Sequence, residues 1–175
     1  YDTLWGYRPE GSGGQEVFPS PPDDVQALAT TPDATRLALA RPGQIEIWLL
    51  HTDAPREWVT LPPDTHVSWL SWSPDGLKLA YVVAEGEEPR LDASPAEGVY
   101  AWIVQRQELV PIVADLDAWA TILGWTPDSD AVLVETYSPS DGRPQRSLID
   151  VETGRTRTLE LPEGARVLGW VGEGW

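Results

Sequence analysis

The chain has 175 residues, enough for one sizeable core or a few repeated units, and it carries 12 basic against 28 acidic residues, for a net charge of −16. Such a surface repels nucleic acid and anionic lipid, so we expect neither as a partner. Because cysteine is absent, no disulfide or thiolate site is possible, and no apolar run reaches the roughly 18 residues that a membrane span needs.

Methionine is absent as well, and the N-terminal stretch shows no apolar region of a signal peptide. A primary translation product begins with methionine, so we expect the chain to be processed, excised or incomplete. The many prolines and arginines beside a single lysine, Lys78, suggest the coding bias of a GC-rich bacterial genome.

The N-terminal stretch, residues 3–25, aligns with residues 46–67 further along the chain. Trp5 falls on Trp48, and the Pro-Pro-Asp beginning at Pro21 falls on a second Pro-Pro-Asp beginning at Pro62. The alignment predicts that residues 1–24 form a hairpin equivalent to the second half of a repeated unit.

One short phrase is written three times, as LATTPDATRLALA (28–40), LSWSPDGLKLAYVV (70–83) and LGWTPDSDAVLV (123–134). Proline presets the second residue of a type I turn, aspartate caps the backbone amides that follow, and glycine supplies a positive φ. We therefore predict tight turns at 31–34, 73–76 and 126–129. Aspartate holds the third turn position in each copy, and a glutamate near the C-terminus is a fourth candidate for that position: Asp33, Asp75, Asp128 and Glu173.

The repetition favours a structural role for these aspartates, because chemistry needs one site whereas a repeated fold needs the turn in every unit. Asp128-Ser129-Asp130 resembles a fragment of a calcium loop, but it lacks the spaced ligands and the glycine of one. We expect no metal site there.

After each turn, every repeat continues with two more apolar-rich runs: 45–50 and 57–62, then 98–105 and 108–113, then 146–151 and 156–162. Each unit thus reads as four short strands. Four strands repeated every 40 to 50 residues or so indicate an all-β fold, a β-propeller of four-stranded antiparallel blades, without a long helix. The predicted blades are 25–66, 67–118 and 119–165, followed at 166–175 by the first strand of a closing or further blade.

Ten tryptophans occur in the chain, and most follow the repeat. Trp72, Trp125 and Trp170 share the place before the turn, while Trp5, Trp48 and Trp102 recur in the third strand of each unit. Large flat side chains suit the packing between blades, where an indole N–H can reach a backbone acceptor. The tryptophans that the repeat does not explain are Trp58, Trp119 and Trp175.

The phrase WSPDG (72–76), followed by LKLAYV, resembles the WD40-like repeat of TolB-type proteins, called PD40, and the repeats in propeller domains of prolyl-oligopeptidase-type peptidases. The resemblance covers about residues 3–175, with one near-perfect motif and two degraded copies. In TolB-type proteins it implies a periplasmic location and protein binding. In the peptidases it implies a domain that gates a separate catalytic part.

No catalytic residue is predicted, because the sequence has no GxSxG motif and its two histidines lack a suitable context. We expect His51 on an outer strand and His66 in a loop. Zinc spacing, a phosphate loop and a dinucleotide fingerprint are also missing, so we predict no cofactor.

Loops on a rigid scaffold are where function concentrates, and the longest predicted loop is 85–98, followed by 138–145 and 114–119. All three belong to one face of a propeller. This face is either a solvated acidic surface or a recognition surface for a basic peptide or a cation. The candidate partner-binding residues are Glu85, Glu87, Glu88, Arg90, Asp92, Asp115, Asp117, Trp119, Asp141 and Arg143.

The sequence favours a non-catalytic, extracytoplasmic scaffold for protein binding or assembly. The alternatives are the propeller part of a hydrolase whose catalytic portion lies elsewhere, and a carbohydrate-binding propeller that uses rim tryptophans. The strand count reaches about three and three-quarter blades, which leaves three ways to close the ring: continuation in a longer chain, pairing with a second copy, or self-closure at four blades.

Overall fold

The structure, a computed structural model, describes residues 4–7, 14–18, 23–50, 55–62, 65–85, 96–137 and 143–160. Every regular element in these ranges is a β-strand, and none of their segments is a helix that could cross a membrane. The strands of the N-terminal part are β1 (Leu4–Tyr7), β2 (Gly14–Phe18), β3 (Ala27–Thr30), β4 (Arg36–Arg41), β5 (Gln44–Leu49) and β6 (Pro55–Thr60). The remaining strands are β7 (Thr65–Trp72), β8 (Lys78–Glu85), β9 (Ala96–Ile103), β10 (Glu108–Trp125), β11 (Ala131–Tyr137), β12 (Pro144–Asp150) and β13 (Thr156–Leu159).

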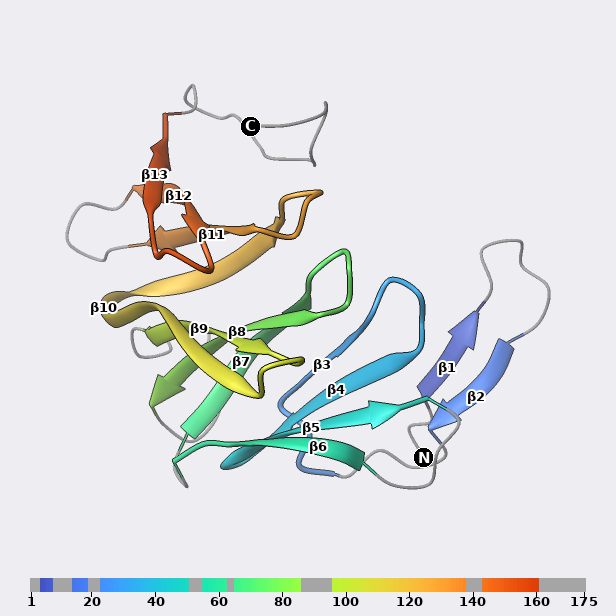
Figure 1. The fold of residues 1–175 in the computed structure, drawn as a ribbon. Coiled ribbons are helices and arrows are strands. Elements are labelled where there is room, and N and C mark those ends of the chain that lie inside the picture. The colour runs from blue at the N-terminus through green and yellow to red at the C-terminus, as the bar shows by residue number, and fades with distance from the viewer. Residues whose placement is uncertain are drawn as a thin grey trace.

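The strands form consecutive antiparallel sheets, as the repeat predicts (Figure 1). β1 and β2 pair as a hairpin, and β3 to β6 form a four-stranded sheet, the first blade. β7, β8, β9 and residues 108–118 of β10 form the second blade. Residues 119–125 of β10 with β11, β12 and β13 form the third blade. The fold is therefore a partial β-propeller.

One loop prediction is wrong. Residues 114–119 were expected to form a loop between blades, but they belong to β10, which runs without a break from the outer edge of the second blade into the third. The pairing with β9 shifts register between Ala114 and Ala118, so an irregularity in the strand replaces the loop. The alternation of Ala and Leu with Asp in this stretch fits a strand as well as it fits a polar loop.

The three predicted turns are confirmed, and each is closed by the same hydrogen bond. The amide of the fourth turn residue donates to the carbonyl of the first, with N···O distances of 2.9 Å for Ala34 to Thr31, Gly76 to Ser73 and Ser129 to Thr126. The fourth residue has a positive φ in every copy: 53° for Ala34, 68° for Gly76 and 65° for Ser129. The degraded copies thus keep the geometry that glycine adopts most easily.

The core lies between the blades, where sheets pack face to face. One cluster joins the first blade (Ala38, Ala40 and Ile45 among others) to the second (Leu70, Trp72 and others). A second cluster joins the opposite face of the second blade to the third, and its members include Val82, Ala101, Trp125 and Val132. A small third cluster, Ala131, Leu133 and Leu148 with Leu159 packed against it, lies on the far face of the third blade.

Two tryptophans connect the first strand of the second blade and the first strand of the third blade to the first strand of the blade before. Trp72 Nε1 donates to the carbonyl of Ala29 at 3.2 Å, and Trp125 Nε1 donates to that of Ser71 at 3.1 Å. Ala29 and Ser71 occupy the same place, two residues before the turn. The predicted packing role of these two indoles, with a backbone acceptor, is confirmed, while Trp170 lies outside the described residues.

Candidate functional site

The turns lie side by side and are connected by a cation from the neighbouring blade. At the sixth turn position, Arg36 Nη1 donates to the carbonyl of Gly76 at 2.7 Å, and Lys78 Nζ donates to that of Ser129 at 2.8 Å. The acceptors hold the same fourth turn position in the next blade. The first and second blades thus each donate a hydrogen bond to the turn of the next blade.

The turn aspartates act within their own turns, as the repetition predicted. Asp75 Oδ1 accepts from Ser73 Oγ at 2.6 Å and from the Leu77 amide at 2.9 Å. Burial favours a higher pKa for Asp75, but these hydrogen bonds outweigh it, and its pKa lies below the ordinary value. Hydrogen bonds from Thr31 lower the pKa of Asp33, and those with Thr126 lower that of Asp128.

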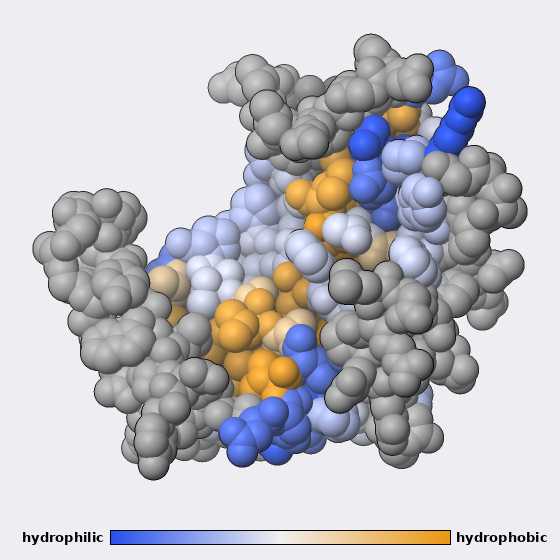
Figure 2. Space-filling model, turned by 180° about the vertical axis from the view of Figure 1, so that it is seen from behind, coloured by the Kyte–Doolittle hydropathy of each residue, from blue (hydrophilic) through white to orange (hydrophobic). Residues whose placement is uncertain are grey.

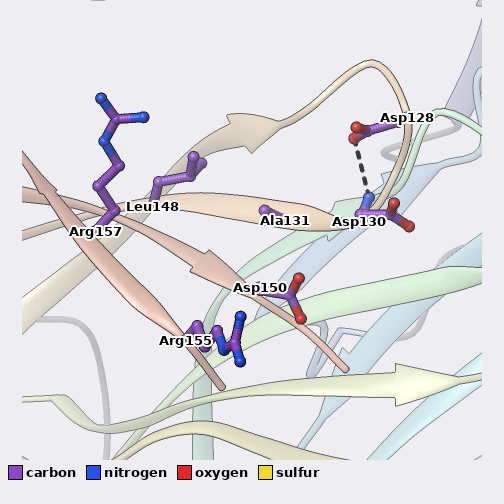
Figure 3. A pocket seen from close by; sticks show the side chains of 7 residues that line it. All are labelled: Asp128, Asp130, Ala131, Leu148, Asp150, Arg155 and Arg157. Atoms are coloured by element: carbon purple, nitrogen blue, oxygen red, sulfur yellow. Dashed lines mark hydrogen bonds between the residues drawn. The ribbon is translucent and has the colours of Figure 1, made fainter. Parts of the chain in front are cut away.

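The third blade differs from the first two, because its sixth turn position is Ala131, whose side chain cannot donate a hydrogen bond. Instead, a hollow of about 290 Å³ opens beside it, and its lining is labelled in Figure 3. The lining residues are Asp128, Asp130, Ala131, Leu148, Asp150, Arg155 and Arg157. Arg155 lies beside Asp150, and Arg157 lies farther along β13.

The far face of the third blade also differs from the equivalent faces of the first two. The cross-strand pair Ala40–Ile45 of the first blade and Val82–Val99 of the second are apolar and pack into the cores. Their counterpart in the third blade is Glu135–Arg146, an ion pair with a 2.7 Å separation and both side chains partly exposed. The neighbouring cross-strand pair on the same face, Leu133–Leu148, is apolar.

The predicted partner-binding surface lies largely outside what the structure describes. Glu87, Glu88, Arg90, Asp92 and Asp141 are outside the described residues. Glu85 ends β8, and Asp115 and Asp117 lie within β10, so only their backbone is described. β8 extends to Glu85 and β9 begins at Ala96, so both ends of the predicted loop 85–98 belong to strands, and residues 86–95 lie outside the described part of the chain.

Two residues of the predicted surface are described with their side chains. Arg143 is exposed and directly precedes β12. Trp119 is 39% exposed and pairs across the strands with Tyr137, which is 41% exposed. Their rings stack with centroids 6.4 Å apart at an interplanar angle of 30°. The stack lies where β11 ends and the segment 138–142 begins.

Other exposed aromatic and aliphatic side chains were not singled out by the repeat. Trp69 in β7 is 45% exposed and follows a register shift, and Leu123 in β10 lies within another. Since β3 contacts β7 and β7 contacts β10, these residues lie on neighbouring first strands. Trp58, one of the tryptophans that the repeat does not explain, is 54% exposed. Figure 2 shows apolar residues gathered in separate patches on the face seen from behind.

The prediction for His66 is wrong. His66 lies in β7 rather than in a loop and is only 6% exposed, because the strand begins at Thr65 and pairs from its first residue. Burial lowers the pKa of His66. His51 lies outside the described residues. Across the described part of the chain, no three His, Asp or Glu residues are grouped as metal ligands would be.

No protein-family model and no curated protein matches the sequence. Solved structures do match: a dipeptidyl peptidase 4 from Porphyromonas gingivalis has a TM-score of 0.63 and 15% identity over 89% of this chain and 28% of its own. A protein assigned as TolB from Agrobacterium tumefaciens has a TM-score of 0.62 and 19% identity over 90% of this chain and 53% of its own. A dipeptidyl aminopeptidase IV from Bacteroides ovatus reaches 0.58 and 11% over 83% and 24%.

These similarities agree with the TolB-type and peptidase-propeller resemblance of the repeats, and they show the fold. The chain spans about half of the TolB structure and about a quarter of each peptidase. What those proteins do as a whole is therefore not carried over to this chain by the match.

Proposed function

We propose that the chain acts as a non-catalytic propeller scaffold that binds a protein partner outside the cytoplasm. The observation that carries the proposal is the stacked pair Trp119–Tyr137. The two residues lie on neighbouring strands, and each side chain is about 40% exposed. Exposed aromatic groups on rigid strands lose little entropy on binding, and tryptophan and tyrosine dominate binding hot spots.

The acidic residues of segment 85–98 favour binding at the same face and suggest that the partner is basic. The segment 85–98 contains five acidic residues against one arginine, and the whole chain carries a net charge of −16. Such a surface attracts a basic protein segment and accelerates its association. The extracytoplasmic location is supported by the resemblance of the repeats to TolB-type sequences.

Binding of a fluorescently labelled lysine-rich peptide tests the proposal, with a glutamate-rich peptide of equal length as the negative probe. The double reversal E87K/E88K is expected to weaken binding by about tenfold and to reduce its salt dependence. W119A is expected to weaken binding by a similar factor, because it removes the aromatic anchor.

The matched control is E108K/E152K, which makes the same change of net charge at the link between β9 and β10 and after β12. Both glutamates are about half exposed and pair there with Arg106. Antiparallel topology places these links at the opposite ends of the strands from the proposed face. If both double reversals weaken binding equally, the chain senses only net charge and the proposed face is rejected.

A further inference from the structure

The far face of the third blade carries a buried apolar pair. Leu133 and Leu148 are cross-strand partners on β11 and β12, and they are only 1% and 5% exposed. Among the described residues, the cluster that contains this pair consists only of members of the third blade itself. A single sheet leaves the side chains of its free face in contact with water. Another segment must therefore cover Leu133 and Leu148.

The two described interfaces between blades show how such a face is covered. In each interface, a tryptophan of the next blade packs on a row of cross-strand partners and donates its Nε1 to the carbonyl of the first residue in that row. The rows are Ala29–Ala38–Ile47 for Trp72 and Ser71–Ala80–Ala101 for Trp125. The corresponding row of the third blade is Gly124–Leu133–Leu148. The buried pair thus lies where the next tryptophan of the series would pack.

The sequence supplies a next tryptophan at the matching distance. The letters LGW at 168–170 repeat those at 123–125. From the last residue of β6, 12 residues lead to Trp72, and from the last residue of β13, 11 residues lead to Trp170. The chain after β13 is therefore long enough to return from the outer strand of the third blade to the inner side of the fold. Residues 166–171 lie outside the described part of the chain.

We infer that residues 166–171 cover the far face of the third blade as the first strand of a further blade. Trp170 packs on Leu133 and Leu148, and its indole N–H donates to the carbonyl of Gly124. The cover comes from the same chain rather than from a second copy, because a net charge of −16 makes two copies repel each other.

NMR on the full chain, labelled on its tryptophan and leucine side chains, tests this contact. Nuclear Overhauser effects are expected between the ring of Trp170 and the methyl groups of Leu133 and Leu148. An isotope-filtered spectrum of a mixture of labelled and unlabelled chains separates contacts within one chain from contacts between copies. Absence of these effects, or their appearance only between copies, overturns the inference.

A variant tests the hydrogen bond separately. Trp170→Phe keeps an aromatic ring and removes the N–H group, so it is expected to raise the equilibrium constant for unfolding about three- to tenfold, as Trp125→Phe should. The matched control is Trp58→Phe, because the side chain of Trp58 is 54% exposed and its replacement should leave the urea midpoint unchanged. A W170F chain with the same midpoint as the W58F chain overturns the inference.

Discussion

Replacing the single lysine, Lys78, should lower the free energy of unfolding, because its side chain connects the second and third blades. Lys78 lies at the start of β8, its side chain is 12% exposed, and its Nζ donates to the carbonyl of the buried Ser129. Lys78→Met keeps the unbranched stem and removes the ammonium. The carbonyl of Ser129 then loses its side-chain donor from the neighbouring blade.

The magnitude follows from these two contacts. A hydrogen bond from a charged donor contributes about 1.5–3 kcal/mol. The second contact, from Nζ to Asp130 at 3.7 Å, adds less than about 1 kcal/mol because Asp130 is 67% exposed. Loss of the ammonium also removes its desolvation cost, so we expect a net loss of about 2 kcal/mol in the free energy of unfolding. For a chain of this size the melting temperature should fall by roughly 4–8 °C.

Thermal and urea unfolding, followed by circular dichroism, measure the effect. Arg106→Met is the control, because Arg106 is 47% exposed and both its glutamate partners are about half exposed. That variant should cost less than about 1 kcal/mol. A K78M chain as stable as wild type, or an R106M chain that loses as much as K78M, would refute the role assigned to this contact.

Two further predictions concern the turns. Gly76→Ala should lower the free energy of unfolding by about 1–2 kcal/mol because of the positive φ, and by more because the added Cβ would lie 3.3 Å from Thr31 Cγ2. Gly154→Ala should show only the effect of the positive φ, since nothing lies within 4 Å of its added Cβ. Equal urea midpoints for the two variants would contradict this. Asp75 has a folded pKa below its unfolded value of 3.8, so its contribution to stability is present above that pH and is lost as pH falls through the folded pKa. D75N should therefore be less stable at neutral pH, and its melting temperature should fall less than that of wild type between about pH 5 and pH 3; parallel pH profiles would argue against it.

Much of the fold could be predicted from the sequence because the turn phrase combines several local constraints. Proline at the second position, aspartate at the third and alternating apolar runs on both sides leave few conformations open. The continuity of β10 could not be predicted, because Asp115 and Asp117 are typical of a loop but are also compatible with an irregularity within a strand. His66 was misplaced for a similar reason: its neighbours Asp64 and Thr65 read as turn residues, although β7 begins at Thr65.

The candidate surfaces were less predictable, since they depend on which blade face is covered. The signal for the third blade was nevertheless present in the repeats: Arg36 and Lys78 align with Ala131, and Ala40 and Val82 align with Glu135. The stacking of Trp119 on Tyr137 needed the strand register, because the two residues are far apart in sequence and meet only as cross-strand partners.

The fold consists of sheets that pack as successive blades, and the indoles of Trp72 and Trp125 donate hydrogen bonds across the two interfaces between blades. Hydrogen exchange of the tryptophan indole N–H groups, followed by NMR on uniformly 15N-labelled protein with assignment by single Trp→Phe variants, measures this contact itself. We predict that Trp72 and Trp125, 6% and 5% exposed, keep their protons long after Trp58 and Trp119, 54% and 39% exposed, have exchanged. Exchange of Trp72 and Trp125 as fast as that of the two exposed indoles would contradict the blade packing.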